Sequence, residues 1–94
     1  MNTIIDSNRQ EILALATKNG VKNVRVFGSM VRDDAHSGSD VDLLVELEAG
    51  KTGFALGGFL MDVQDLLNRQ VDVVTVNALY PAIRDQVLSE AQPL

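Results

Sequence analysis

The chain has 94 residues, a formal net charge of −5 and no cysteine, which indicates one small domain spanning 1–94 and excludes disulfides and zinc–thiolate sites. No apolar run approaches the roughly 20 residues of a membrane span, and the first residues lack the features of a signal peptide, so we expect a cytoplasmic protein. The eight Lys and Arg residues are scattered along an acidic chain, which disfavours DNA or RNA as a direct partner.

The first predicted elements are a helix and a strand. Ser7-Asn8-Arg9-Gln10 fits a capping box, and the apolar stripe behind it, closed by Gly20, predicts a helix over about 7–18. Residues 24–27 alternate as a strand that runs into Gly28-Ser29. The remaining predicted elements are, in chain order, a helical turn at 30–35, a central strand at 41–47, a polar loop at 48–53, a helix at 54–68, a strand at 70–76 and a last helix at 81–90.

This order of elements predicts the fold class. Helices alternate with strands along the whole chain, and the strand at 41–47 is apolar nearly throughout, as is typical of a strand buried on both faces. We therefore expect an α/β sandwich, with a small mixed β-sheet of three to four strands flanked by helices.

One motif spans the first two predicted strands. Gly28-Ser29 ends the first strand, and after ten residues Asp40-Val41-Asp42 begins the second. Because strand side chains alternate, Asp40 and Asp42 share one face with Cβ atoms roughly 6–7 Å apart, while Val41 points into the core. Two such carboxylates suit the hard cation Mg²⁺.

The glycine–serine pair completes a phosphate site in this interpretation. Gly28 lets the backbone approach a phosphate closely, and Ser29 offers a hydroxyl and an N–H group at the start of a helical turn. Arg32, four residues after Gly28, is a candidate for pairing with triphosphate oxygens. Phosphates held beside two metal-binding carboxylates indicate phosphoryl or nucleotidyl transfer.

Asp72 is the candidate for a third carboxylate. It lies in an apolar strand, where an unpaired charge costs several kcal/mol. A metal shared with Asp40 and Asp42 would supply its partner, and Asp72 also fits a base for the attacking hydroxyl. Alternatively, the strand lies at the edge of the sheet and Asp72 faces water.

The predicted helix at 54–68 is apolar on two sides. The broader stripe should face the sheet and contains Leu56, Phe59, Leu60, Val63, Leu66 and Leu67. The opposite side carries Phe54, Gly57, Gly58 and Met61. Adjacent glycines suggest close approach by another surface, either the loop at 48–53 or a chain terminus, or a partner protein or second copy of the chain.

At these motifs the chain resembles the DNA polymerase β-like nucleotidyltransferase superfamily, whose pattern is Gly-Ser, a spacer, Asp-x-Asp and a later third acid. More narrowly, it is similar to the minimal nucleotidyltransferases, the MNT antitoxins that pair with HEPN toxins. The segments that carry the resemblance are 26–29, 39–45, 71–75 and 84–91. The resemblance implies a polymerase β-like nucleotidyltransferase core.

The resemblance also implies roles for individual residues. Asp40, Asp42 and Asp72 would bind Mg²⁺, with two ions expected, while Gly28 and Ser29 would hold the phosphates of ATP. The implied reaction transfers AMP from ATP onto a tyrosine of the cognate HEPN toxin, an RNase, and so silences it. In one departure from the family, Asp33 stands where Gly usually follows the arginine.

Two other functions stay open at this point. The chain could neutralise a toxin by contact alone, although the presence of all three acids argues against a decayed site. It could also modify a small molecule such as an antibiotic. Larger relatives carry a helical domain that holds the acceptor, for which 94 residues leave no room, so we expect a partner protein to bring the acceptor. A homo-oligomer is a further partner arrangement that the sequence allows.

Overall fold

The structure is a computed structural model that describes residues 3–32 and 39–94. Its elements are, in chain order, α1 (Thr3–Ser7), α2 (Arg9–Asn19), β1 (Val21–Phe27), a 3₁₀ turn (Gly28–Met30), β2 (Val41–Leu47), α3 (Gly53–Leu67), β3 (Val71–Thr75), a second 3₁₀ turn (Val76–Ala78), α4 (Pro81–Glu90) and β4 (Gln92–Pro93). The predicted bounds of β2 and α4 are confirmed, and those of α3 and β3 hold to within one residue. The helical turn expected at 30–35 forms two residues earlier, and its last three residues lie outside the described part.

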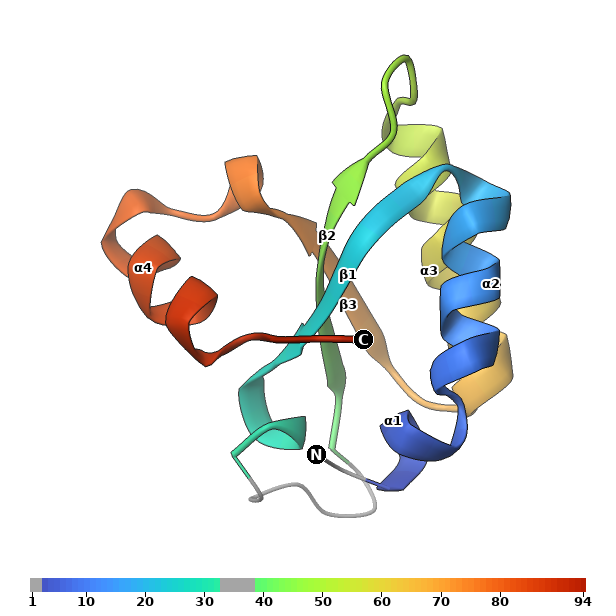
Figure 1. The fold of residues 1–94 in the computed structure, drawn as a ribbon, viewed down its shortest axis with the longest axis horizontal. Coiled ribbons are helices and arrows are strands. Elements are labelled where there is room, and N and C mark those ends of the chain that lie inside the picture. Colours follow the sequence, from blue (N-terminus) through green and yellow to red (C-terminus); the bar gives the residue numbers. More distant parts are fainter. Residues whose placement is uncertain (1–2, 33–38) are drawn as a thin grey trace.

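The strands form a four-stranded mixed sheet in the order β3-β2-β1-β4. β1 pairs antiparallel with both β2 and β4, whereas β2 pairs parallel with β3. Helices α2 and α3 lie together on one side of this sheet, and α4 lies on the other (Figure 1). The predicted α/β class, the strand count and the central position of β2 are therefore confirmed.

The hydrophobic core lies between the sheet and the α2–α3 side. Val41, Leu43 and Val45 of β2 are fully buried there. The predicted sheet-facing stripe of α3 supplies the other side: Phe59, Val63 and Leu67 are buried, and Leu56, Leu60 and Leu66 are partly buried against the same cluster. Alternation along β2 thus leaves Asp42 on the opposite face, toward α4.

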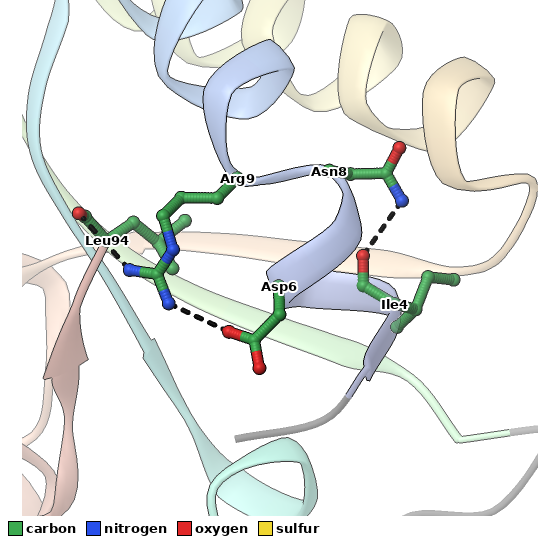
Figure 2. Close-up of polar contacts among 5 residues, drawn as sticks. All are labelled: Ile4, Asp6, Asn8, Arg9 and Leu94. Atoms are coloured by element: carbon green, nitrogen blue, oxygen red, sulfur yellow. Dashed lines mark hydrogen bonds and ion pairs between the residues drawn. The ribbon is translucent and has the colours of Figure 1, made fainter.

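The N-terminal helix is divided in two, which corrects the single helix predicted over 7–18. The capping box is also wrong: Asn8 is the N-cap of α2 but makes no capping hydrogen bond with its side chain. Its Nδ2 instead donates to the carbonyl of Ile4, one turn back in α1 (Figure 2). A short polar residue that bonds to a preceding carbonyl favours a break between helices. The predicted end at Gly20 is confirmed, with a φ of 75°.

Arg9 ties this break to the other end of the chain. Its Nη2 donates to Asp6 Oδ1 at 2.8 Å, and its Nη1 lies 3.5 Å from the main-chain carbonyl of Leu94 (Figure 2). The N–H of Leu94 in turn donates to the carbonyl of Val24 in β1. These contacts fix the segment that follows α4 against the edge of the sheet.

Strand β1 begins at Val21, three residues before the predicted start. Asn23 adopts a left-handed conformation with a φ of 51°, and the β1–β2 register shifts between Lys22 and Arg25. This bulge interrupts the alternation of buried and exposed positions, which is the signal that identifies a strand in a sequence.

The second side of α3 is open to solvent at two of its apolar side chains. Phe54 is 92% exposed and Met61 is 65% exposed, so neither the loop at 48–53 nor a described terminal residue covers them. Gly58, however, faces α2, because a Cβ added there would lie 2.5 Å from Asn19 Oδ1. The close approach inferred from the two glycines is thus internal at Gly58, whereas Gly57 has open space around it.

Helix α4 covers its side of the sheet only loosely. It begins at Pro81 as expected, but none of its residues is fully buried. Ile83 and Leu88 remain partly exposed. Over the described ranges, no helix combines the length and apolar character that crossing a membrane requires.

Candidate active site

Gly28 and Asp42 meet at the end of β1. Phe27 is paired with Asp42 across the β1–β2 ladder, which brings the turn and the carboxylate together although they are fourteen positions apart in the sequence. Gly28 has a φ of 75°, and a Cβ there would lie 2.5 Å from Asp42 Oδ2. Both the conformation and the space therefore require glycine at this position.

Asp72 is the register partner of Asp42 in the parallel β2–β3 pair. It is exposed, and β3 is the edge strand of the sheet. This corrects the expectation that Asp72 lies buried in an apolar strand and agrees with the alternative that it faces water. The edge position nevertheless leaves Asp72 beside Asp42 on the face that α4 overlooks.

The environment of Asp42 raises its pKa from 3.8 to about 6. Partial burial is the largest cause, followed by the negative charges of Asp72 and Asp40, and a side-chain hydrogen bond with Asp72 acts in the same direction. The charge of Arg32 opposes these effects. The charges of Asp40, Asp72 and Arg32 therefore all act on the Asp42 carboxyl.

These carboxylates fit Mg²⁺ by the chemistry of their oxygens, which are hard ligands. A cation would also relieve the mutual repulsion that raises the pKa of Asp42. In the parts of the chain that the structure describes, however, no three acidic or histidine side chains converge on a common metal position. Binding of an ion would therefore require Asp40, which is exposed, and its neighbours to turn toward one another.

Main-chain contacts hold the start of β2 in place. Arg69 Nη1 donates to the carbonyl of Ser39 at 3.2 Å, and the N–H of Val41 donates to the carbonyl of Gln70 at 3.0 Å. Ser39 is buried. The segment between α3 and β3 thus fixes the backbone on both sides of Asp40, a support that the sequence motif did not reveal.

The expected phosphate-binding groups already have an acidic partner. The N–H of Gly28 donates to Glu90 Oε1 at 3.0 Å, and Arg32 Nη1 donates to the same oxygen at 3.0 Å. Ser29 lies next to them in the 3₁₀ turn and is half-buried. Glu90 was not identified from the sequence, where it is an ordinary acid at the end of a helix.

A shallow groove of about 300 Å³ connects these groups. One wall contains Phe27, Gly28, Arg32 and Asp42, and the other is formed by α4 through Ile83, Gln86, Val87 and Glu90. A larger groove of about 530 Å³ lies at the far end of β2, beside Glu46 and Asn77, but contains none of the candidate residues. The chemistry therefore assigns the site to the smaller groove. Asp33, the departure from the family pattern, lies outside the described residues.

The chain is similar to known proteins over most of its length. Residues 9–94 match the family described as Nucleotidyltransferase domain. The chain is 34% identical to a candidate protein adenylyltransferase of Methanocaldococcus jannaschii, over 93% of its own length and 94% of the relative's. It is 32% identical to the protein adenylyltransferase MntA of Thermococcus cleftensis, over 96% of its own length and 88% of the relative's.

Solved structures give the same fold. The structure of a candidate minimal nucleotidyltransferase superposes with a TM-score of 0.87 at 39% identity, covering 100% of this chain and 97% of that one. An MNT antitoxin, solved in complex with a tri-AMPylated HEPN toxin of Shewanella oneidensis, superposes with a TM-score of 0.67 at 20% identity, covering 94% and 69%. At that identity the second likeness shows the fold alone.

Proposed function

The chain belongs to the nucleotidyltransferase domain family, and we propose that it is a Mg²⁺-dependent protein adenylyltransferase that moves AMP from ATP onto a hydroxyl of a cognate HEPN toxin. The acceptor hydroxyl is a tyrosine in this proposal, and the modification makes the protein an antitoxin. Support comes from two relatives above 30% identity that are named as protein adenylyltransferases, one of them a candidate. The solved complex of an MNT antitoxin with a tri-AMPylated HEPN toxin supports the choice of partner.

The observation that carries the proposal is the meeting of Gly28, Asp42 and Asp72 at one end of the sheet. A Cβ on the turn glycine would lie 2.5 Å from Asp42 Oδ2, and Asp72 is paired with Asp42 in the next strand. The turn to which this proposal assigns phosphate binding therefore lies next to one carboxylate, with a second carboxylate paired to the first in the neighbouring strand. Structural packing alone does not require two like charges to be neighbours, because their repulsion opposes folding.

Each residue then has a task in the reaction. The Gly28 N–H, Ser29 and Arg32 hold the triphosphate, as anion-binding groups at the start of a helical turn do. Bound at Asp40, Asp42 and Asp72, Mg²⁺ would neutralise phosphate charge and stabilise the attacking and leaving oxygens. Asp72, exposed at the sheet edge, accepts the proton of the incoming hydroxyl.

The bond changes balance without a further reactant. The hydroxyl oxygen of the acceptor forms a bond to the α-phosphorus of ATP, and the bond from that phosphorus to the bridging oxygen breaks. Pyrophosphate leaves with the bonding electrons, and the hydroxyl proton passes to Asp72. Because the groove is shallow and Asp72 is exposed, a hydroxyl on the surface of another protein can reach the site.

The test is transfer of label from ATP labelled at the α-phosphate to the product of the neighbouring gene in the presence of Mg²⁺. Asp40→Asn combined with Asp42→Asn should abolish transfer and leave the fold intact. The matched control is Glu48→Gln with Asp65→Asn, which removes two exposed charges away from the site. Full transfer by the first double variant would refute the proposal. Neutralisation of the toxin without label would favour contact alone, and label only on added antibiotic would favour a small-molecule acceptor.

A further inference from the structure

Glu90 lies at the point where the proposed function requires a phosphate. A single oxygen, Oε1, accepts hydrogen bonds from the Gly28 N–H and from Arg32, both at 3.0 Å. These two donors are also the ones expected to bind the triphosphate. A carboxylate that accepts from a turn N–H and a guanidinium makes the contacts that a phosphate oxygen would make.

The backbone next to Glu90 is fixed, which makes this contact a built feature of the fold. Strand β4 begins two residues after Glu90. Its residues Gln92 and Pro93 pair with Val26 and Arg25 of β1, close to the end of that strand. The Glu90 side chain is only 20% exposed, and it lines the groove beside Asp42. Release of the carboxylate therefore needs rotation of one side chain and leaves the β1–β4 pairing in place.

We propose that Glu90 is an internal competitor for the nucleotide: its carboxylate occupies the triphosphate position at Gly28 and Arg32 and must leave before ATP binds. The inference rests on the proposed function and adds a control on that site. While Glu90 is bound, the fraction of molecules able to accept ATP is reduced, and the apparent dissociation constant rises by the same factor. Glu90 thus weakens binding of ATP without touching the reacting atoms.

The experiment measures ATP binding to the full chain by isothermal titration, in EDTA and again in Mg²⁺. Glu90→Gln keeps an oxygen that can accept from Gly28 and removes the charge that competes with phosphate. We expect it to bind ATP about tenfold more tightly than the unaltered chain, because a tenfold change in affinity is about what one charge-assisted hydrogen bond contributes. Asp85→Asn, which removes an exposed charge from the same helix outside the groove, should bind as the unaltered chain does.

A structural readout separates competition from mere support of the turn. In the unaltered chain, addition of ATP should shift the ¹³C resonance of the Glu90 carboxylate, because the group leaves its donors. Where the unaltered chain binds ATP, unchanged or weaker ATP binding by Glu90→Gln would overturn the inference, as would a Glu90 resonance that ATP leaves in place. Failure of Glu90→Gln to fold would overturn it in either case.

Inorganic triphosphate serves as a second probe, so that the two proposals can fail separately. If Glu90→Gln and the unaltered chain bind ATP equally well, competition by Glu90 is refuted, whereas the proposed adenylyltransferase activity is not. Tighter binding of triphosphate by Glu90→Gln, with no binding of ATP by either protein, would support the competition at the anion site and refute the adenylyltransferase.

Discussion

The Asp42 carboxylate occupies the space into which a side chain at residue 28 would grow, since a Cβ on Gly28 would lie 2.5 Å from Asp42 Oδ2. Gly28→Ala must also hold alanine at a φ of 75°, which costs about 1–2 kcal/mol. We expect this variant to lose ATP binding and to melt at a lower temperature. Each kcal/mol lost from the free energy of unfolding lowers Tm by about 4–8 °C. Thermal melting and ATP titration check it, with Gly50→Ala as the control, because Gly50 has a φ of 83° but nothing within 4 Å. ATP binding that survives in Gly28→Ala would separate this turn from the phosphate site.

Asp72→Asn should lower turnover far more than ATP affinity. Asp72 is exposed at the sheet edge, while Asp42 lies in the groove with the phosphate-binding turn. If Asp72 acts as the base, proton transfer fails while the other two acids still hold the ion that accompanies ATP. Single-turnover rates and the dissociation constant of ATP, measured side by side, give the answer. Loss of affinity with no separate effect on the rate would contradict this role.

The stability of the protein without metal should fall as the pH rises through about 6, where Asp42 ionises. Its pKa in the folded state lies above the ordinary 3.8, so the folded state binds the proton more tightly and ionisation opposes folding. The full benefit exists below about pH 3.8 and is lost above about pH 6. Asp42→Asn should therefore raise Tm at pH 7.5 and not at pH 4.

Because Asp42 is only partly buried, solvent screening reduces this gain to about 1 kcal/mol, or about 4–8 °C. Added Mg²⁺ should raise Tm of the unaltered chain at pH 7.5 and have little effect on Asp42→Asn. Thermal melts across pH, with and without the ion, measure both effects. Equal pH profiles for the two proteins would show that Asp42 does not carry the effect.

Replacement by alanine should change the stability of the protein differently at Gly57 and at Gly58. Gly57 has open space, so Gly57→Ala gains helix propensity of about 1 kcal/mol. At Gly58 the new Cβ would meet Asn19, whose Nδ2 is held by Leu15 and Asp62 at 2.9 Å each. Gly58→Ala must break these contacts and should be neutral or destabilising. Chemical denaturation of both variants makes the comparison, and an equal gain at both positions would refute the α2–α3 contact.

The sequence predicts an apolar patch on α3, formed by Phe54, Gly57, Gly58 and Met61, that is covered either by the chain itself or by a partner. Phe54 and Met61 remain exposed in the structure. Met61→Lys should leave the fold and ATP binding unchanged, because Met61 is 65% exposed, and should weaken binding of the partner toxin. Ala14→Lys adds the same charge on the exposed side of α2 and serves as the control. Co-purification with the toxin and titration measure the effect. Normal toxin binding by Met61→Lys would assign the interface to another surface.

Periodicity alone determined much of this fold. The apolar run of β2, the stripe of α3 and the proline that begins α4 were read to within one residue, because each pattern repeats with the local geometry of its element. Alternation also set Asp42 on the face opposite Val41. The division at Asn8 and the bulge at Asn23 were missed, because each depends on a single residue that breaks the repeat.

Strand order and long-range contact were decided only in the tertiary structure. The sequence pattern of β3 fits an edge strand as well as a central strand. In the folded sheet β3 pairs with β2 and with no other strand, which puts Asp72 at the edge and beside Asp42. Glu90 reaches Gly28 across 62 positions because β4 pairs with β1. Which strands become neighbours depends on packing summed over the whole chain, so local patterns supply the candidate residues and the folded sheet selects those that meet.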